Sequence, residues 1–277
     1  MPNGALATIG HVQQAVSQLL TSREPQFIRF GWMILSGIMF WRFFRLGMKW
    51  LYTKEDHALE LTDLILLLSV NGMLLTFYDA PLPGTGISAS NMVTDTTGFL
   101  ANLLDARSLA NTFTSLDILW GKFVQPGVLD VLMNLMYWAL FLGLLFTKAV
   151  ALGVVAMSLI FSAVAALLGP LFVPWLSMPG HGNKLFWGWF WAFLEYSFLQ
   201  VTMFAYLFVG EKFITRFVMG LPNVIIDSQF PLYIAEVATV IGTYVIGVLL
   251  VPVLNHSLFS GHGGGTGPGI FAGMVKR

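Results

Sequence analysis

The 277-residue sequence contains no cysteine and few charged side chains. The absence of cysteine excludes structural disulfides, cysteine-ligated zinc, iron–sulfur clusters and thiol nucleophiles. Charged residues make up 10% of the chain, against about 25% in an ordinary soluble domain, whereas 56% of the residues are hydrophobic. So few charges cannot cover a water-soluble surface, and so much apolar sequence excludes a disordered chain. The composition is that of a polytopic membrane protein.

Several catalytic and nucleotide-binding motifs are also missing. The chain contains neither a G-x-x-x-x-G-K-[ST] loop nor a strand-flanked G-x-G-x-x-G, so we do not expect an ATP motor. It lacks G-x-S-x-G and H-E-x-x-H, and its five histidines fall at expected helix ends or in loops, where we interpret them as surface or interface residues. Fourteen acidic residues cancel fourteen basic ones, which argues against general nucleic-acid binding. We therefore expect no enzyme, no catalytic residue, no cofactor and no metal site.

Six apolar stretches approach or exceed the roughly 20 residues that a helix needs to cross a membrane. They are continuous rather than alternating, which predicts helices and not a β-barrel. The sequence thus predicts an all-α polytopic membrane protein with about five to six transmembrane helices. The stretches run over Phe27–Met48, Leu61–Tyr78, Val128–Thr147, Ala149–Leu176, Leu185–Val209 and Pro231–Leu254.

Only Lys148 separates the third stretch from the fourth. One apolar tract of the combined length would greatly exceed the bilayer thickness. We therefore predict two helices joined by a tight turn at Thr147 and Lys148. A single long helix that projects out of the membrane stays open as the alternative, because neither glycine nor proline marks this turn.

Amphipathic helices are predicted outside these stretches. Before the first stretch, Val12 and Val16 recur at helical spacing among polar residues, and Pro25 is expected to end this short helix. In the long polar segment between the second and third stretches, the loop APLPGTGISAS precedes an amphipathic region. Phe113 and Trp120 lie on the apolar faces of one or two short helices there, and we interpret them as candidate partner-docking residues.

The basic residues predict the orientation of the chain. The densest basic cluster follows the first stretch, and placing it in the cytoplasm puts the N-terminus outside. We expect five segments: an amphipathic helix at 1–26, a first transmembrane pair at 27–79, an outside central segment at 80–127, a transmembrane helical cluster at 128–255 and a glycine-rich tail at 256–277.

Polar side chains within the apolar stretches are candidate functional residues, because a charge at mid-bilayer costs free energy unless it is paired, protonated or facing water. Glu195 lies about ten residues into the fifth stretch, near mid-depth. It is either a pore, proton or subunit-contact site or a structural carboxylate. Asn71 and Asn134 are further intramembrane candidates. A structural role is favoured for three residues near helix ends, Asp63, Asp130 and Glu236.

Prolines, small residues and tryptophans mark the fourth and fifth stretches. Pro170 and Pro174 remove helical hydrogen bonds, and the carbonyls that they free must face protein or water. Trp189 and Trp191 form part of an interfacial anchoring belt or a docking ridge for a partner. Small residues recur every four positions and predict close helix packing, at Ser158, Ser162 and Ala166.

The segment 158–208 resembles the TrbL/VirB-six family, the polytopic inner-membrane subunits of type IV secretion and conjugation systems. In that family a small-residue-rich helix ends in a Gly-Pro-apolar-Phe element, and a polar link leads to a Trp-bearing helix. The first element is matched by Gly169, Pro170, Leu171 and Phe172, and the second by Lys184, Phe186 and Trp189 or Trp191. The order of helices and central segment resembles the family as well.

The resemblance implies a scaffold and channel subunit of the bacterial inner membrane, with a periplasmic N-terminus and central segment. It implies a homo-oligomeric ring at the base of a stalk or pilus. The implied partners are pilus-tip and pilin subunits, secretion ATPases, other inner-membrane subunits and lipids, with DNA or protein passing transiently. The alternative is a secondary transporter or proton-conducting channel that uses Glu195, which the lack of an evident inverted repeat disfavours.

Overall fold

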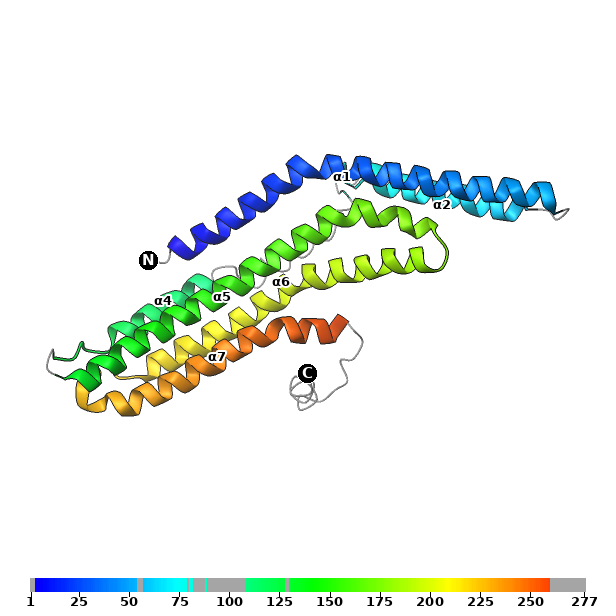
Figure 1. Ribbon diagram of the computed structural model, residues 1–277. Helices are drawn as coiled ribbons and strands as arrows, with labels where there is room; N and C mark the ends of the chain where they lie inside the picture. The colour runs from blue at the N-terminus through cyan, green and yellow to red at the C-terminus, as the bar shows by residue number, and fades with distance from the viewer. Residues whose placement is uncertain are drawn as a thin grey trace. The chain divides into compact units, whose positions relative to one another are not determined.

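The computed structural model describes residues 3–53, 57–78, 80–81, 88, 108–127 and 130–259 (Figure 1). Within these ranges the regular secondary structure is helical. One isolated parallel bridge joins Phe123 to Ile225. Five helical segments are long and apolar enough to cross a membrane, which confirms the predicted all-α polytopic class. The candidate spans are Ser22–Tyr52, Ala58–Thr76, Val131–Ser177, Gly182–Gly220 and Phe230–Phe259.

The first helix, α1 (Asn3–Tyr52), continues through Pro25. The predicted end of an amphipathic helix near Pro25 is therefore wrong. A proline inside a helix leaves one carbonyl without its donor, but helical sequence on both sides can carry the helix past it with a kink. Figure 1 shows a bend in the N-terminal half of α1, as expected for a helix with an internal proline.

The helix α5 (Val131–Phe172) also runs without a break, through Thr147 and Lys148. The predicted turn at these residues is wrong, and the alternative of one long helix is the observed one. At 1.5 Å per residue, its 42 residues extend about 63 Å, roughly twice the hydrocarbon thickness of a bilayer. Because the third and fourth stretches merge, the chain has five candidate spans among its described residues and not six.

The chain reverses direction after α5. The short 3-10 helix η1 (Val173–Ser177) carries Pro174 in its first turn, where a missing N–H costs little. Gly180 has a φ of 77°, a left-handed conformation that favours glycine, immediately before α6 (His181–Gly220). The two prolines and Gly180 thus end α5 and start α6 where the sequence predicts a break.

The chain divides into two compact units. Unit 1 takes residues 1–12, 98–158 and 198–277, and unit 2 takes residues 13–97 and 159–197. Each unit is described by itself below.

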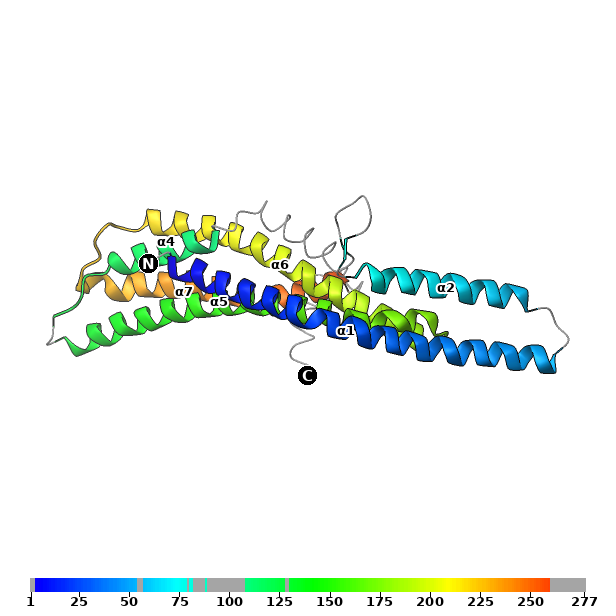
Figure 2. The same cartoon turned by 90° about the horizontal axis from the view of Figure 1, so that it is seen from above.

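Unit 2 contains the hairpin of α1 and α2 (Ala58–Thr76), the end of α5, η1 and the start of α6. Figures 1 and 2 both show the hairpin reaching beyond the turn between α5 and α6. A buried apolar cluster joins these elements, and it consists of Leu35, Met39, Leu64, Leu75, Tyr78, Val173 and Phe186.

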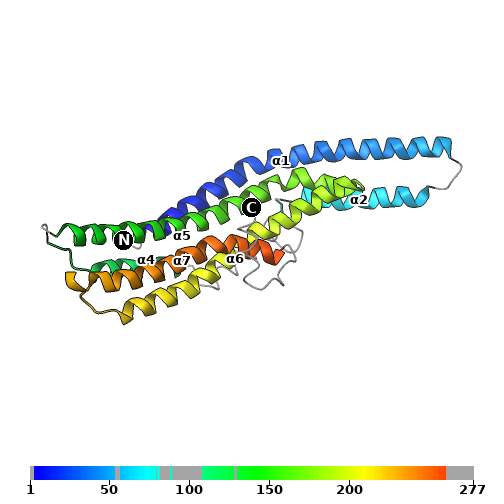
Figure 3. The same ribbon diagram turned by 60° about the horizontal axis from the view of Figure 1, so that its bottom comes forward.

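Unit 1 packs α4 (Ser108–Gly121) and α7 (Phe230–Phe259) with the adjoining parts of α5 and α6, as Figure 3 shows. The 3-10 helix η2 (Asp227–Gln229) leads into α7. Phe230 is fully buried there, and its ring centroid lies 5.4 Å from that of Phe123 and 6.5 Å from that of Tyr137. Burying such aromatic rings is a large apolar contribution to the packing of this unit.

Candidate functional site

Pro170, a candidate contact residue from the sequence, lies beside the residues that follow α2. Because proline has no N–H, the carbonyl of Ala166, four residues earlier in α5, has no helical donor. The hydroxyl of Tyr78 donates a hydrogen bond to that carbonyl oxygen. Burial raises the pKa of Tyr78 well above its ordinary value, so the hydroxyl keeps the proton that it donates. The expectation that carbonyls freed by the prolines face protein or water is confirmed at Ala166.

Two glycines allow the close approach around Pro170. A Cβ atom added to Gly169 would lie 1.8 Å from the Tyr78 hydroxyl oxygen and 2.6 Å from Trp189. One added to Gly31 of α1 would lie 2.4 Å from the carbonyl oxygen of Pro170. Neither position can hold a larger residue without a shift of its neighbours, so the Gly-Pro element of the sequence is a packing site in this unit.

The small residues predicted to pack closely do so. Ser158, Ser162 and Ala166 are all buried. The hydroxyl oxygens of Ser162 on α5 and Ser197 on α6 lie 3.2 Å apart, within hydrogen-bond distance. Such contacts hold helices together where water is absent.

Asn71 connects α2 to η1. Its side chain is fully buried, and its amide nitrogen donates to the Ser177 hydroxyl and, at 3.0 Å, to the Leu67 carbonyl. The backbone carbonyl of Ser177 also accepts a hydrogen bond from the Arg42 guanidinium of α1. Asn71 and Arg42 therefore hold both helices of the hairpin against one residue at the start of the α5–α6 turn.

A pocket of about 380 Å³ opens beside this contact. It lies between α1, α2 and the residues directly after η1, and its lining consists of Trp41, Arg42, Arg45, Leu46, Lys49, Glu60, Asp63, Leu64, Met178 and Pro179. Five of these ten residues carry a formal charge, three of them positive. We call this cavity the charged pocket.

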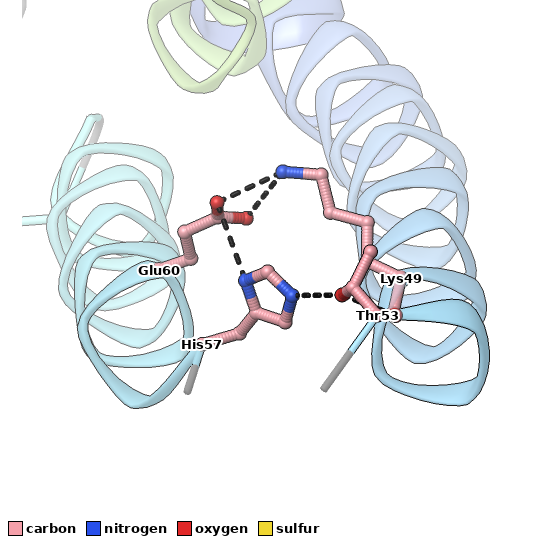
Figure 4. A network of polar contacts seen from close by, with 4 residues as sticks. All are labelled: Lys49, Thr53, His57 and Glu60. Carbon is pink, nitrogen blue, oxygen red and sulfur yellow. Dashed lines mark hydrogen bonds and ion pairs between the residues drawn. The ribbon is translucent and has the colours of Figure 1, made fainter. Parts of the chain in front are cut away.

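A polar network connects two residues of the lining, Lys49 and Glu60, with His57 and Thr53 (Figure 4). Lys49 Nζ lies 2.8 Å from both carboxylate oxygens of Glu60, so the ammonium and the carboxylate neutralise each other. His57 lies 3.6 Å from Glu60 through Nδ1 and 2.7 Å from the Thr53 hydroxyl through Nε2. His57 is buried between the two helices of the hairpin, which agrees with the interface alternative of the prediction and not with a surface position.

Two further charges of the charged pocket lack such partners. Neither Arg45 nor Asp63 is joined by a hydrogen bond or an ion pair to another residue in the described ranges. Both side chains are exposed. Within the part of the chain that the structure describes, the pocket therefore presents one guanidinium and one carboxylate without a charged partner.

Glu195 is half-buried on α6 in unit 2 and does not line the charged pocket. It has an interaction within the chain, and it lies two residues before Ser197, whose hydroxyl packs against α5. The carboxylate is thus placed near a helix contact, while its role as a transport, subunit-contact or structural group stays a prediction.

The two predicted tryptophans of α6 have different surroundings. Trp189 donates its indole N–H to the Ala165 carbonyl at 2.8 Å, and its ring stacks on those of Phe172 and Phe193. The ring of Trp189 thus packs against its own chain, and a role in docking a partner stays a prediction. Trp191 is 54% exposed and remains a candidate for contact with a partner or a lipid.

The docking residues predicted on the central segment are occupied as well. Phe113 on α4 is buried, with Lys148 Nζ 5.7 Å from its ring centroid. Trp120 is half-buried, and its ring centroid lies 4.0 Å from that of Tyr137 on α5. The apolar face of α4 covers α5 of its own chain, and docking of a partner at Phe113 and Trp120 stays a prediction. The neighbouring predictions for residues 82–87 and 89–107 lie outside the described residues.

Polar contacts also attach α4 to α5 and α6 within unit 1. Lys148 of α5 forms an ion pair with Asp117 of α4, which gives this charge in an apolar tract a partner. Glu211 on α6 is buried and accepts a hydrogen bond from Asn111 at 3.3 Å. The isolation of Lys148 in the sequence could have indicated such a partner, whereas Glu211 gave no such signal.

Asn134 lies in the first turn of α5. Its amide nitrogen donates to the carbonyls of Gly127 at 2.7 Å and Asp130 at 3.0 Å. It therefore fixes the backbone that enters the helix, and the prediction of an intramembrane polar site becomes a structural role at a helix end.

Sequence reasoning did not single out three residues that hold unit 2 together, Tyr78, Ser177 and Gly31. Each is of an ordinary type at an ordinary spacing, and its importance depends on a neighbour far along the chain. Compared with models of known protein families, the sequence matches none. A comparison with curated proteins likewise found no match.

Proposed function

We propose that this chain is a non-enzymatic scaffold and channel subunit of a type IV secretion or conjugation machine in the bacterial inner membrane. The observation that carries the proposal is that polar and large apolar side chains of the helices make different contacts. Polar groups in the apolar helices bind the chain's own helices to one another, as at Asn71, Tyr78 and Lys148. Large apolar side chains meanwhile face outward from the same helices.

The hairpin of α1 and α2 exposes an especially large apolar surface, which lipid or other subunits must cover. In the most apolar windows of α1 and α2, 22% and 17% of the residues are buried. Its exposed aromatic side chains include Phe40 at 73% and Trp41 at 56%. Lipid covers part of such a surface, and neighbouring subunits in a ring would cover the rest. The resemblance of segment 158–208 to the TrbL/VirB-six family supports the choice of machine.

A co-purification experiment tests this proposal. We expect extraction of the full chain from its native host in mild detergent to bring down secretion ATPases and pilus subunits. Trp191→Ala should reduce their recovery severalfold while the chain still inserts and folds, because Trp191 is the exposed member of the predicted pair. Leu249→Ala on α7 changes a similarly exposed apolar side chain outside the hairpin, and as the matched control it should leave recovery unchanged. Recovery of the chain without any such subunit contradicts the proposal.

The transporter alternative is favoured by one observation, the half-buried carboxylate of Glu195 on an apolar helix. In reconstituted vesicles, Glu195→Gln would abolish proton or substrate flux if this carboxylate carries it. We expect no such flux from the purified wild-type chain. A flux that disappears in Glu195→Gln contradicts the scaffold proposal and supports the alternative.

A further inference from the structure

The charged pocket lies near the hairpin end of two candidate membrane spans, Ser22–Tyr52 and Ala58–Thr76. Arg45 lies seven residues before the end of the first span, and Asp63 lies five residues after the start of the second. Each charge is therefore within about two helical turns of a span end. Charged side chains so close to the end of a span reach the depth of the lipid headgroups.

The charges that remain available in the pocket are of both signs. Lys49 is neutralised by Glu60, and Glu60 also faces His57 (Figure 4). One N–H of Arg42 is used by Ser177. What remains is the guanidinium of Arg45, the other N–H groups of Arg42 and the carboxylate of Asp63. A purely anionic ligand would leave Asp63 unpaired, and a purely cationic one would leave Arg45 unpaired.

We propose that the charged pocket binds a zwitterionic phospholipid through its phosphoethanolamine headgroup. Arg45, helped by Arg42, takes the phosphate, because guanidinium groups match phosphate oxygens with paired hydrogen bonds. Asp63 accepts hydrogen bonds from the primary ammonium, two carbons away from the phosphate ester oxygen. A choline headgroup has no N–H to donate, so it fits this carboxylate less well. Trp41 also lines the pocket and is exposed, and an aromatic ring of this kind suits the membrane interface.

This inference requires a chain that crosses a membrane, and it does not depend on the secretion function. Its test uses the full chain in detergent and short-chain lipids with identical tails, differing in headgroup: phosphoethanolamine, phosphocholine and phosphoglycerol. Native mass spectrometry measures the dissociation constant of each. We expect the wild type to bind the phosphoethanolamine lipid about tenfold more tightly than the other two, a measurement that needs no variant.

Two substitutions assign the roles. Asp63→Asn should weaken binding of the phosphoethanolamine lipid about tenfold, to the level of the phosphocholine lipid, and should not weaken the phosphoglycerol lipid. Arg45→Gln should weaken all three about tenfold. The exposed residues Arg29 on α1 and Glu236 on α7 supply matched controls, and Arg29→Gln and Glu236→Gln should change nothing.

Three results would overturn the proposal. Equal binding of the three lipids, unaffected by either substitution, means that the lipids only coat the apolar surface. Tightest binding of the phosphoglycerol lipid, strengthened by Asp63→Asn, means a site for anions alone. Binding of free O-phosphoethanolamine as tight as that of the lipid means that the ligand is a soluble compound and not a membrane component.

Discussion

At the scale of single residues, polar side chains of unit 2 complete hydrogen bonds that the backbone leaves open. Tyr78 supplies the donor that Pro170 removes from Ala166, and Arg42 donates to the Ser177 carbonyl just beyond the end of α5. A buried carbonyl without a donor lowers the stability of the fold by about 1 to 3 kcal/mol, and these contacts avoid that cost. They work only because Gly169 leaves room for Tyr78 to approach.

Gly169→Ala should therefore destabilise the chain by about 1 to 3 kcal/mol, the usual cost of overpacking. The new methyl group would overlap the Tyr78 hydroxyl and the Trp189 ring, and it would displace the hydrogen bond to Ala166. The measurement is the free energy of unfolding in detergent.

Gly153→Ala is the matched control in the same helix, because a Cβ there meets no heavy atom within 4 Å. Alanine stabilises a helix interior by about 0.5 to 1 kcal/mol relative to glycine, so the two variants should have effects of opposite sign. Equal stability of the two variants would show that Tyr78 does not need this space.

At the scale of elements, α4 is held to unit 1 by polar contacts at its C-terminal end. Lys122 follows α4, and its Nζ donates to the carbonyls of Val218 at 2.7 Å and Leu221 at 2.8 Å, where α6 ends. The last carbonyls of a helix have no partner within it, and a lysine can satisfy them. The same region holds the bridge from Phe123 to Ile225.

Lys122→Met keeps the length of the side chain and removes its donors. We expect the last turn of α6 to open more easily, so its amide hydrogens should exchange about tenfold faster, which corresponds to about 1.4 kcal/mol. Hydrogen exchange read by mass spectrometry checks this.

Lys184→Met, at an exposed position in the first turn of α6, controls for the loss of a charge. It should leave hydrogen exchange in the last turn of α6 unchanged. Unchanged exchange in Lys122→Met would mean that the two hydrogen bonds do not hold the end of α6.

At the scale of the whole molecule, the number of membrane crossings decides on which side of the membrane the C-terminus lies. An even number returns the C-terminus to the side of the N-terminus, and an odd number does not. The sequence alone predicted six stretches because Lys148 looked like a turn, whereas α5 is one helix and the candidate spans are five. If the basic cluster faces the cytoplasm, as the sequence predicts, five crossings would put the N-terminus outside and the C-terminus inside.

The absence of cysteine from the sequence makes this testable by labelling single introduced cysteines. A cysteine near the N-terminus should react with an impermeant thiol reagent from outside the cell, and one near the C-terminus should not. Thr53→Cys, at the end of the hairpin, is the internal reference and should behave like the C-terminal position. Labelling of both termini from the same side would contradict five crossings.

By itself the sequence determined the membrane environment and the all-helical class, but not every helix boundary. Continuous apolar stretches and scarce charge require helices in a membrane, and Gly169, Pro170 and Pro174 marked the end of α5 correctly. Phe113 and Trp189 were identified as interaction residues, but a sequence pattern cannot say whether an apolar face meets a partner or its own chain. Only the tertiary structure decided that, and only it brought Tyr78 to Ala166 and Arg45 and Asp63 to one pocket. Helix formation depends on neighbours within a few residues, whereas these contacts depend on pairing between segments far apart in the chain.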